Sequence, residues 1–275
     1  MTPLLRVWGV LVFIFLFLPI FIIVIYSFNT GRLLVSWNGF GFTGYEAVMQ
    51  DEAIRNALWM SLRVAVLSAF FATVIGTLAG VALARRPGKW TYGFLALVAL
   101  VLVTPEIVDA VALLPWFVWL GGDAGITLFN NGLIRLTIGT GIFATAVVAL
   151  IIRARMSGLD ESLEESAADL YATPWNRFRQ ITLPLMAPAV IAAALLAFTL
   201  SLDNTIIASF ISVAGSDTLP IYIFSATRSG LRPDIASVST ILLVLTLLAI
   251  ALVAVVLRSS GDSSTEITQT MTGTG

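Results

Sequence analysis

The sequence contains no cysteine and no histidine among its 275 residues, and both absences exclude chemistry. Without cysteine the chain has no disulfide and no thiolate nucleophile, and the usual ligands of transition metals are missing as well. No G-x-x-x-x-G-K-[ST] phosphate-binding loop occurs, so any ATP hydrolysis that the protein uses must take place on another chain. We therefore predict a chain with no catalytic residue, no metal site and no cofactor of its own.

Charge is also scarce. Asp, Glu, Lys and Arg make up 11% of the chain and leave a net charge of −1, whereas about a quarter of a soluble domain is charged. No basic patch is present, which argues against a nucleic-acid partner. Hydrophobic residues reach 58% and the mean hydropathy is +0.97. These values predict a multi-pass membrane protein in contact with lipid.

Six apolar runs are long enough to cross a bilayer as helices. They cover residues 7–28, 57–84, 92–120, 132–152, 186–210 and 236–257. The third run is interrupted at residues 104–109 by Pro105 and its polar neighbours, and the first lacks a small-residue cleavage site, so we expect a retained helix rather than a cleaved signal peptide. The predicted fold is an all-α transmembrane domain of six helices over residues 1–258, followed by a disordered tail, residues 259–275, rich in Ser, Thr and Gly.

The second run contains a row of small residues. Gly76, Gly80 and Ala84 recur at every fourth position, which places them on one face of a helix. Such a row lets another helix approach closely, so we expect close helix packing at this face.

The distribution of Lys and Arg orients the spans. Six spans put both termini on the same side, and nine of the 15 Lys and Arg residues fall on that side. The positive-inside rule therefore predicts cytoplasmic termini. Residues 29–56, 121–131 and 211–235 are then external, with a short helix expected from Tyr45.

Residues 157–188 form a polar stretch between the fourth and fifth runs. Leu163, Ala167 and Leu170 fall on one helical face, and Pro174 is expected to stop that helix before a second short helix leads back to the membrane. Acidic residues crowd its first turns, where the helix dipole favours negative charge; they are Asp160, Glu161, Glu164 and Glu165. An amphipathic helix lying on lipid headgroups is the alternative, but anionic lipid would repel these acids.

The motif in this stretch resembles a known family. Glu165-Ser-Ala-x-Asp-Leu-Tyr-Ala, followed by Ile181-Thr-Leu-Pro184, is similar to the cytoplasmic "EAA" loop of ABC importer permeases. The resemblance implies a coupling helix that docks into a cleft of an ATPase subunit. Ser166 and Tyr171 replace the family's Ala and Gly, and without that Gly we expect the helix to run on to Ala172. The coupling residues implied are Glu164, Glu165, Ala167, Ala168, Asp169, Tyr171, Ala172 and Pro174.

Three acids fall within or near the apolar runs. Glu106 and Asp109 are three residues apart, and Asp203 follows Ser201 in the fifth run. Burying a charge at bilayer depth costs several kcal/mol, so such residues usually face a pathway or a partner. Trp116 and Trp119 add ring faces that attract cations. Pairing of the acids with basic residues, hydrogen bonds between helices, and an interfacial aromatic belt for the Trp pair are the alternatives.

A second resemblance narrows the substrate class. Residues 197–210, together with Thr218-Leu-Pro220, Pro233-Asp-Ile and Ser239-Thr240, are similar to polyamine importer permeases, and most of all to their putrescine-type subunit. Asn204 stands where that family commonly has a second acid, which favours a smaller or less charged amine. The substrate pathway so implied comprises Glu106, Asp109, Trp116, Asp203, Asn204 and Tyr222.

The same resemblance implies the assembly. We expect a type I ABC importer permease in the inner membrane, paired with a second, related permease. Two ATPase subunits would carry ATP and Mg, and an external binding protein would deliver the substrate. Import of another organic cation, an amino-acid conjugate or ferric ion, a stand-alone secondary transporter or channel, and a purely structural membrane subunit are the alternatives.

Overall fold

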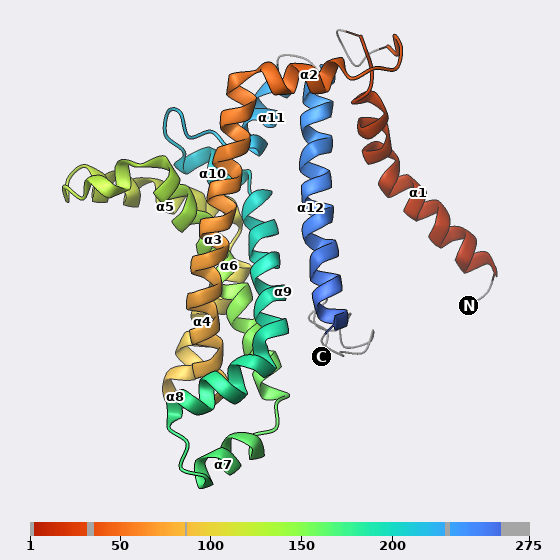
Figure 1. The fold of residues 1–275 in the computed structure, drawn as a ribbon. Helices are drawn as coiled ribbons and strands as arrows, with labels where there is room; N and C mark the ends of the chain where they lie inside the picture. Colours follow the sequence, from red (N-terminus) through yellow and green to blue (C-terminus); the bar gives the residue numbers. More distant parts are fainter. Residues whose placement is uncertain (1–2, 32–35, 86, 229–231, 260–275) are drawn as a thin grey trace. The chain divides into compact units, whose positions relative to one another are not determined.

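The computed structural model describes residues 3–31, 36–85, 87–228 and 232–259 (Figure 1). Apart from an isolated bridge between Asn29 and Phe40, regular structure in these ranges is helical, which confirms the all-α prediction. The last helix ends at Ser259, and the rest of the predicted tail lies outside the described residues.

The helices follow one another with short connections. In chain order they are α1 (Pro3–Tyr26), α2 (Thr43–Gln50), α3 (Glu52–Arg85), α4 (Lys89–Val103), α5 (Glu106–Gly121), η1 (Thr127–Asn130), α6 (Gly132–Ser157), α7 (Ser162–Asp169), α8 (Pro174–Arg177), η2 (Phe178–Thr182), α9 (Leu183–Leu202), α10 (Ile206–Ile211), α11 (Leu219–Thr227) and α12 (Pro233–Ser259). Two compact units emerge: residues 1–59 with 218–246, and residues 60–217 with 247–275.

Five helices are long and apolar enough to cross a membrane. They are Leu5–Tyr26, Glu52–Arg85, Gly132–Ser157, Pro174–Leu202 and Pro233–Val255. The third predicted span, residues 92–120, corresponds to α4 and α5, which pass the same test together but are bent by 105° at their junction. Thr104 precedes Pro105 and has an extended backbone, with ψ 130°, as the proline ring requires of its predecessor. The predicted interruption of this span is therefore confirmed.

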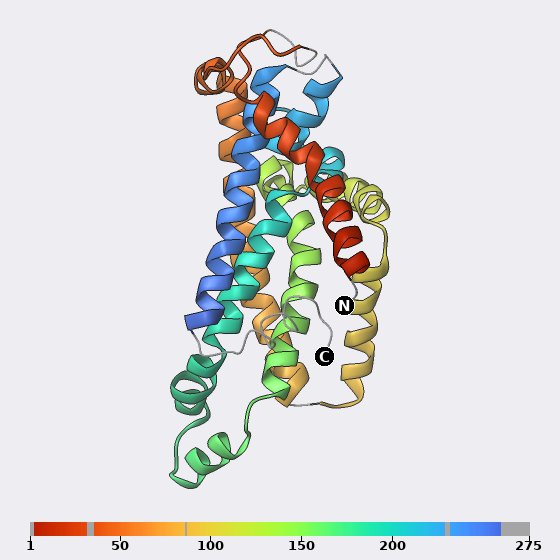
Figure 2. The same ribbon diagram turned by 90° about the vertical axis from the view of Figure 1, so that its right-hand side faces the viewer.

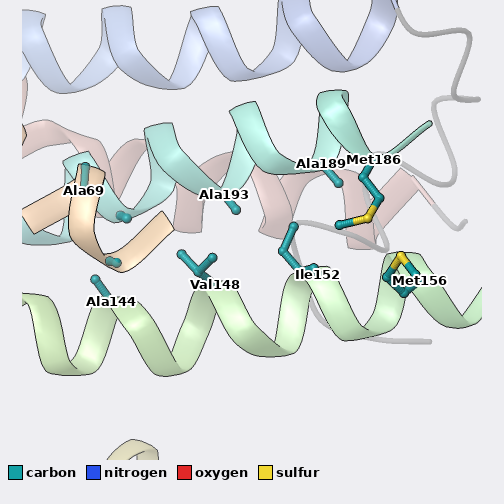
Figure 3. Close-up of a cluster of buried hydrophobic side chains, with 10 residues drawn as sticks. Ala69, Ala144, Val148, Ile152, Met156, Met186, Ala189 and Ala193 are labelled. Atoms are coloured by element: carbon teal, nitrogen blue, oxygen red, sulfur yellow. The ribbon is translucent and has the colours of Figure 1, made fainter. Parts of the chain in front are cut away.

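Small side chains bring α3, α6 and α9 together in the second unit. Figure 3 shows α6 and α9 side by side, with alanines opposite larger aliphatic residues. Because alanine keeps the helix axes close, the few larger side chains fill the remaining space at high density. The buried cluster consists of Ala69, Ala72, Ala144, Val148, Ile152, Met156, Met186, Ala189, Ala193 and Ala197.

The glycines of α3 lie against α6, as expected from their spacing. A Cβ at Gly76 would lie 2.7 Å from Val148 Cβ, and one at Gly80 would lie 2.7 Å from the carbonyl oxygen of Ala149. Ser68 adds a polar tie, since its hydroxyl lies 2.8 Å from Thr140 Oγ1. Close approach of α3 and α6 therefore depends on the missing side chains.

The first unit has its own small core. Val48 of α2, Leu219 of α11 and Val238 of α12 are buried in it together with Ile54 and Ala57 of α3. The short helix expected from Tyr45 is confirmed as α2. Helix α11 lies in the segment 211–235, for which we predicted an external position but no helix.

A glycine substitution tests the packing of α3 on α6. We expect Gly80→Ala to destabilise the fold by about 1–3 kcal/mol, because the added Cβ overlaps backbone that cannot move away. Thermal unfolding of the full chain in detergent, followed by circular dichroism, measures the change. Gly93→Ala in α4 is the matched control, because a Cβ there meets nothing within 4 Å. An equal loss of stability in both variants would contradict the packing argument.

Candidate functional site

A side-chain hydrogen bond from Asp160 holds the turn that leads into helix α7. Asp160 Oδ1 accepts a hydrogen bond from the Ser162 N–H at 2.9 Å. Hydrogen bonds from the backbone and hydroxyl of Ser162 lower the pKa of the Asp160 carboxyl. Glu164 and Glu165 follow in the first turn of α7, where the helix dipole favours negative charge. The acidic cluster seen in the sequence therefore marks a helix start.

The end of α7 corrects one prediction. Instead of running to Ala172, the helix stops at Asp169, and Tyr171 adopts a left-handed backbone with φ 61°. The Tyr171 N–H donates to Ala168 O (2.9 Å) and the Ala172 N–H to Ala167 O (3.0 Å). Tyr171 thus makes the tight turn that glycine would make more easily, so the prediction that its loss extends the helix was wrong.

Pro174 has a different role from the one expected. It does not stop α7, which ends five residues earlier, but stands at the start of α8. A proline fits the first turn of a helix because its missing N–H is not needed there. Thr173 caps this start by accepting a hydrogen bond from the Asn176 N–H at 3.3 Å. The second short helix is confirmed, and it continues through η2 into α9.

The apolar side chains around α7 are exposed. Leu170 is 81% exposed and Tyr171 96% exposed, and Leu163 and Trp175 are exposed as well. Helix α7 has no buried residue. Of the predicted face, Leu163 and Ala167 lie in α7, whereas Leu170 follows the end of the helix, and none of the three is buried within the described chain.

Polar contacts hold α7 instead. Glu164 Oε1 accepts hydrogen bonds from Arg85 Nη2 at 3.0 Å and from Thr182 Oγ1 at 2.8 Å. Arg85 Nη1 also pairs with Glu161 Oε1 at 2.6 Å. A cavity of about 410 Å³ adjoins these groups and reaches Arg177. The contacts link α7 to the end of α3 and to η2.

A second cavity contains two of the predicted pathway acids. Its volume is about 450 Å³, and its lining residues come from α5, α9, the break after α9 and the start of α10. They are Glu106, Thr199, Leu200, Asp203, Asn204, Thr205 and Ile206. Carboxylate, amide and hydroxyl groups thus line the cavity without any Lys or Arg, so its electrostatics favour a cation.

The fifth span breaks at this cavity. We expected a helix to residue 210, but α9 ends at Leu202 and α10 begins at Ile206. Asn204 Oδ1 accepts the Ala208 N–H (3.4 Å), while its Nδ2 faces Glu106 Oε1 at 3.5 Å. Short polar side chains compete with the helix for backbone hydrogen bonds, which explains the break.

The other predicted pathway residues lie elsewhere. Asp109 lines a separate, mostly apolar cavity of about 140 Å³. Trp116 stacks on Trp119, with ring centroids 5.3 Å apart, and is absent from the lining of the cavity with Glu106. Tyr222 belongs to the first unit, where it packs on the core around Leu219. The structure therefore brings Glu106, Asp203 and Asn204 together at one cavity, and neither Asp109 nor Trp116 is among the residues that line it.

Sequence analysis missed several polar residues at both places. Thr199 and Thr205 line the cavity with Asp203, and their nearness in sequence to that acid was a usable signal. Arg85 and Thr182 contact Glu164. The sequence around each of them looks like that of any residue at the end of a membrane span, so it gave no signal of this contact. Among the described residues no group of three potential ligands could hold a metal ion.

Comparison with known proteins identifies the family. Residues 72–262 match the family model described as "Binding-protein-dependent transport system inner membrane component". The chain belongs to this family. It is a membrane component of a binding-protein-dependent transport system, and its resemblance to importer permeases is confirmed.

Two proteins from Escherichia coli are similar in sequence to most of this chain. The putrescine transport system permease protein PotI is 40% identical over 233 residues, which cover 84% of this chain and 82% of the relative. The spermidine/putrescine transport system permease protein PotC is 34% identical over 256 residues, 92% of this chain and 94% of the relative. Both relatives are transport subunits and not enzymes.

A solved structure shows the same fold. The bacterial alginate ABC transporter, in complex with an alginate pentasaccharide-bound periplasmic protein, contains a chain that matches with a TM-score of 0.64 at 18% identity. The match covers 93% of each chain. The helical arrangement of this family member is therefore that of an ABC importer permease.

The left-handed turn at Tyr171 yields a prediction. A left-handed backbone costs a non-glycine residue about 1 kcal/mol, so Tyr171→Gly should slow exchange of the Ala172 amide about fivefold. Hydrogen exchange of the full chain, followed by mass spectrometry, measures this. Tyr171→Ala is the control, because it removes the ring but keeps the Cβ; equal protection in both variants would show that the backbone is unstrained.

Proposed function

We propose that this chain is the permease subunit of a polyamine importer and moves putrescine- or spermidine-like cations across the inner membrane. The observation that carries the proposal is the cavity of about 450 Å³ that Glu106 and Asp203 line without a basic residue. The names of the relatives support the same substrate class.

The cavity suits a small diamine. Two carboxylates can pair with two ammonium groups, and the hydroxyls of Thr199 and Thr205 can accept further N–H groups. Asn204 adds an uncharged amide where another acid would add a third negative charge. The charge of the cavity therefore matches a dication better than a trication. Asp109, Trp116 and Tyr222 stay predicted members of the wider pathway.

The exposed surface of α7 and α8 is the proposed docking site for an ATPase subunit. Apolar side chains that the described part of the chain leaves exposed, such as Leu170, are suited to burial against a partner. ATP and Mg would be bound by the partner and not by this chain. The proposed docking residues are Glu164, Glu165, Ala167, Ala168, Asp169, Tyr171, Ala172 and Pro174.

The proposed assembly has four kinds of partner. A second, related permease completes the pathway, two ATPase subunits bind on the cytoplasmic side, an external binding protein delivers the amine, and lipid surrounds the spans. The bias of Lys and Arg supports cytoplasmic termini. Closure of the ATPase dimer would move α7 and open the pathway outward, and ATP hydrolysis would reset it.

ATPase measurements test the proposal. We expect ATP hydrolysis by the complete complex in lipid, with its binding protein, to rise with putrescine or spermidine and not with neutral solutes. If the complex hydrolyses ATP but amines do not stimulate the hydrolysis, the importer proposal holds and the proposed substrate class is rejected. Uptake by this chain alone, driven by an ion gradient, would reject the importer.

Loss of either cavity carboxylate should reduce amine uptake. We expect Glu106→Gln and Asp203→Asn each to lower putrescine uptake into proteoliposomes about tenfold or more, because each removes a charged hydrogen-bond partner. Asp123→Asn, at an exposed acid before η1, is the control and should keep full uptake. Unchanged uptake in both cavity variants would exclude this cavity from the pathway.

Loss of Leu170, an exposed leucine directly after α7, should weaken docking of the ATPase subunit. We expect Leu170→Ser to reduce the amount of ATPase subunit that copurifies in detergent, since burying a leucine contributes about 1.5–3 kcal/mol. Leu128→Ser in η1 is the matched control, because Leu128 is also an exposed leucine but lies in a loop predicted to be external. Equal copurification with both variants would contradict docking at α7.

A further inference from the structure

One oxygen atom of Glu164 joins three helical elements. Arg85 is the last residue of α3, Glu164 lies in α7, and Thr182 ends η2, directly before α9. Both donors reach the same atom, Glu164 Oε1, at 3.0 Å and 2.8 Å. Two helices that are long enough to span a membrane are thus tied at their ends to one side chain of α7.

These contacts are partly shielded from water. Thr182 is 4% exposed, and the side chains of Arg85 and Glu164 are 15% and 27% exposed. The second carboxylate on Arg85, that of Glu161, is 68% exposed. Shielded charge pairs with an added hydrogen bond keep a fixed geometry, whereas exposed pairs contribute little. Glu164 is therefore the stronger partner of Arg85.

Helix α7 has no apolar anchorage that could replace these contacts. It buries no residue, and the segments on either side, residues 158–161 and 170–173, are not helical. A helix without buried apolar area can move as a unit at low cost. The polar contacts of Glu164 thus link a residue within α7 to the end of α3 and, through η2, to α9, and the more exposed Glu161 adds a second contact to Arg85.

Thr182 is the last residue of a π-helical element. Residues Phe178–Thr182 form a π-helical turn, a rare form that occurs mostly as single turns at functional sites. A π turn holds one residue more than an α turn and can pass that residue along the helix. A movement of α7 that is transmitted to Thr182 therefore reaches α9 at the end where the helix is most easily displaced along its axis.

We propose that Arg85, Glu164 and Thr182 form a clamp that transmits the movement of α7 to α3 and α9. The three are positioning residues: they do not contact the substrate but set how far docking motion reaches the spans. This inference rests on the proposed function, since it assumes that an ATPase moves α7. It adds which side chains carry the movement and which two helices receive it.

Thr182→Val provides the sharpest test. Valine keeps the shape of threonine and removes the hydroxyl, and the site is buried, so the docking surface is unchanged. In proteoliposomes containing the complete importer, with loaded binding protein, we expect the number of substrate molecules taken up per ATP hydrolysed to fall about tenfold. Copurification of the ATPase and its basal hydrolysis should stay at the wild-type level. Thr182→Ser retains the hydroxyl and should restore the wild-type ratio.

Two further variants compare the contributions of the Glu164 and Glu161 carboxylates to the ratio of uptake to ATP hydrolysis. Glu164→Gln should lower the same ratio at least as far as Thr182→Val, because it weakens both contacts. Glu161→Gln should leave it within about twofold, since that carboxylate is exposed and makes one contact. A wild-type ratio in both Thr182→Val and Glu164→Gln would overturn the clamp, as would a loss in Thr182→Val that Thr182→Ser does not restore.

The substrate proposal can fail separately. If the wild-type complex takes up a different solute, the ratio is measured with that solute, and the clamp is judged on the same variants. If the wild-type complex couples uptake of an amine to ATP and every clamp variant does so equally well, the proposed function stands and the clamp falls.

Discussion

The fold depends on one constraint: backbone polar groups in a bilayer must find partners within the protein. Long helices meet this constraint by themselves, and irregular backbone is tolerated only where it lines a cavity or is buried in protein. Both helix breaks among the described apolar segments obey this rule. The break at Pro105 places Glu106 at the cavity, and the break after Leu202 places Asp203 and Asn204 there. The cavity and the breaks are therefore one feature.

Helix α9 runs between this cavity and the contact with α7. Its first residue follows Thr182, which contacts Glu164, and its last precedes Asp203. Its 20 residues span about 30 Å, so a displacement at one end reaches the other without an intermediate. Most of the buried residues that α9 presents to α6 are alanines, and Met186 near its start is a larger one (Figure 3). A face made mostly of small side chains permits sliding along the helix axis more readily than one with deep knobs throughout.

The sequence predicted whole elements well and local geometry less well. Long apolar runs give α1, α3, α6 and α12, because a helix that faces lipid needs little beyond length and hydropathy. Figure 2 shows α4 as a separate upright helix, and Pro105 had indicated where its span breaks. By contrast, the pairing of Arg85 with Glu164 joins residues 79 apart, and that of Asn204 with Glu106 joins residues 98 apart. No local pattern encodes such pairs. The turn at Tyr171 was not predicted, because the left-handed backbone is present although tyrosine stands in place of the glycine that usually adopts it.

The retention of a left-handed backbone at a tyrosine has a physical consequence for docking. The strain of about 1 kcal/mol has no compensation within the described chain, because the ring is 96% exposed. Burial of an aromatic ring against a partner gains about 1.5–3 kcal/mol, which exceeds the strain. A fixed turn also holds the ring in place before contact, and this reduces the entropy lost on association. We therefore expect Tyr171→Gly to act in opposite directions on the two processes: it relaxes the turn in the free chain and weakens association with the ATPase. Copurification of the ATPase with this variant measures the second effect, and unchanged association would show that the ring stays in solvent when the helix docks.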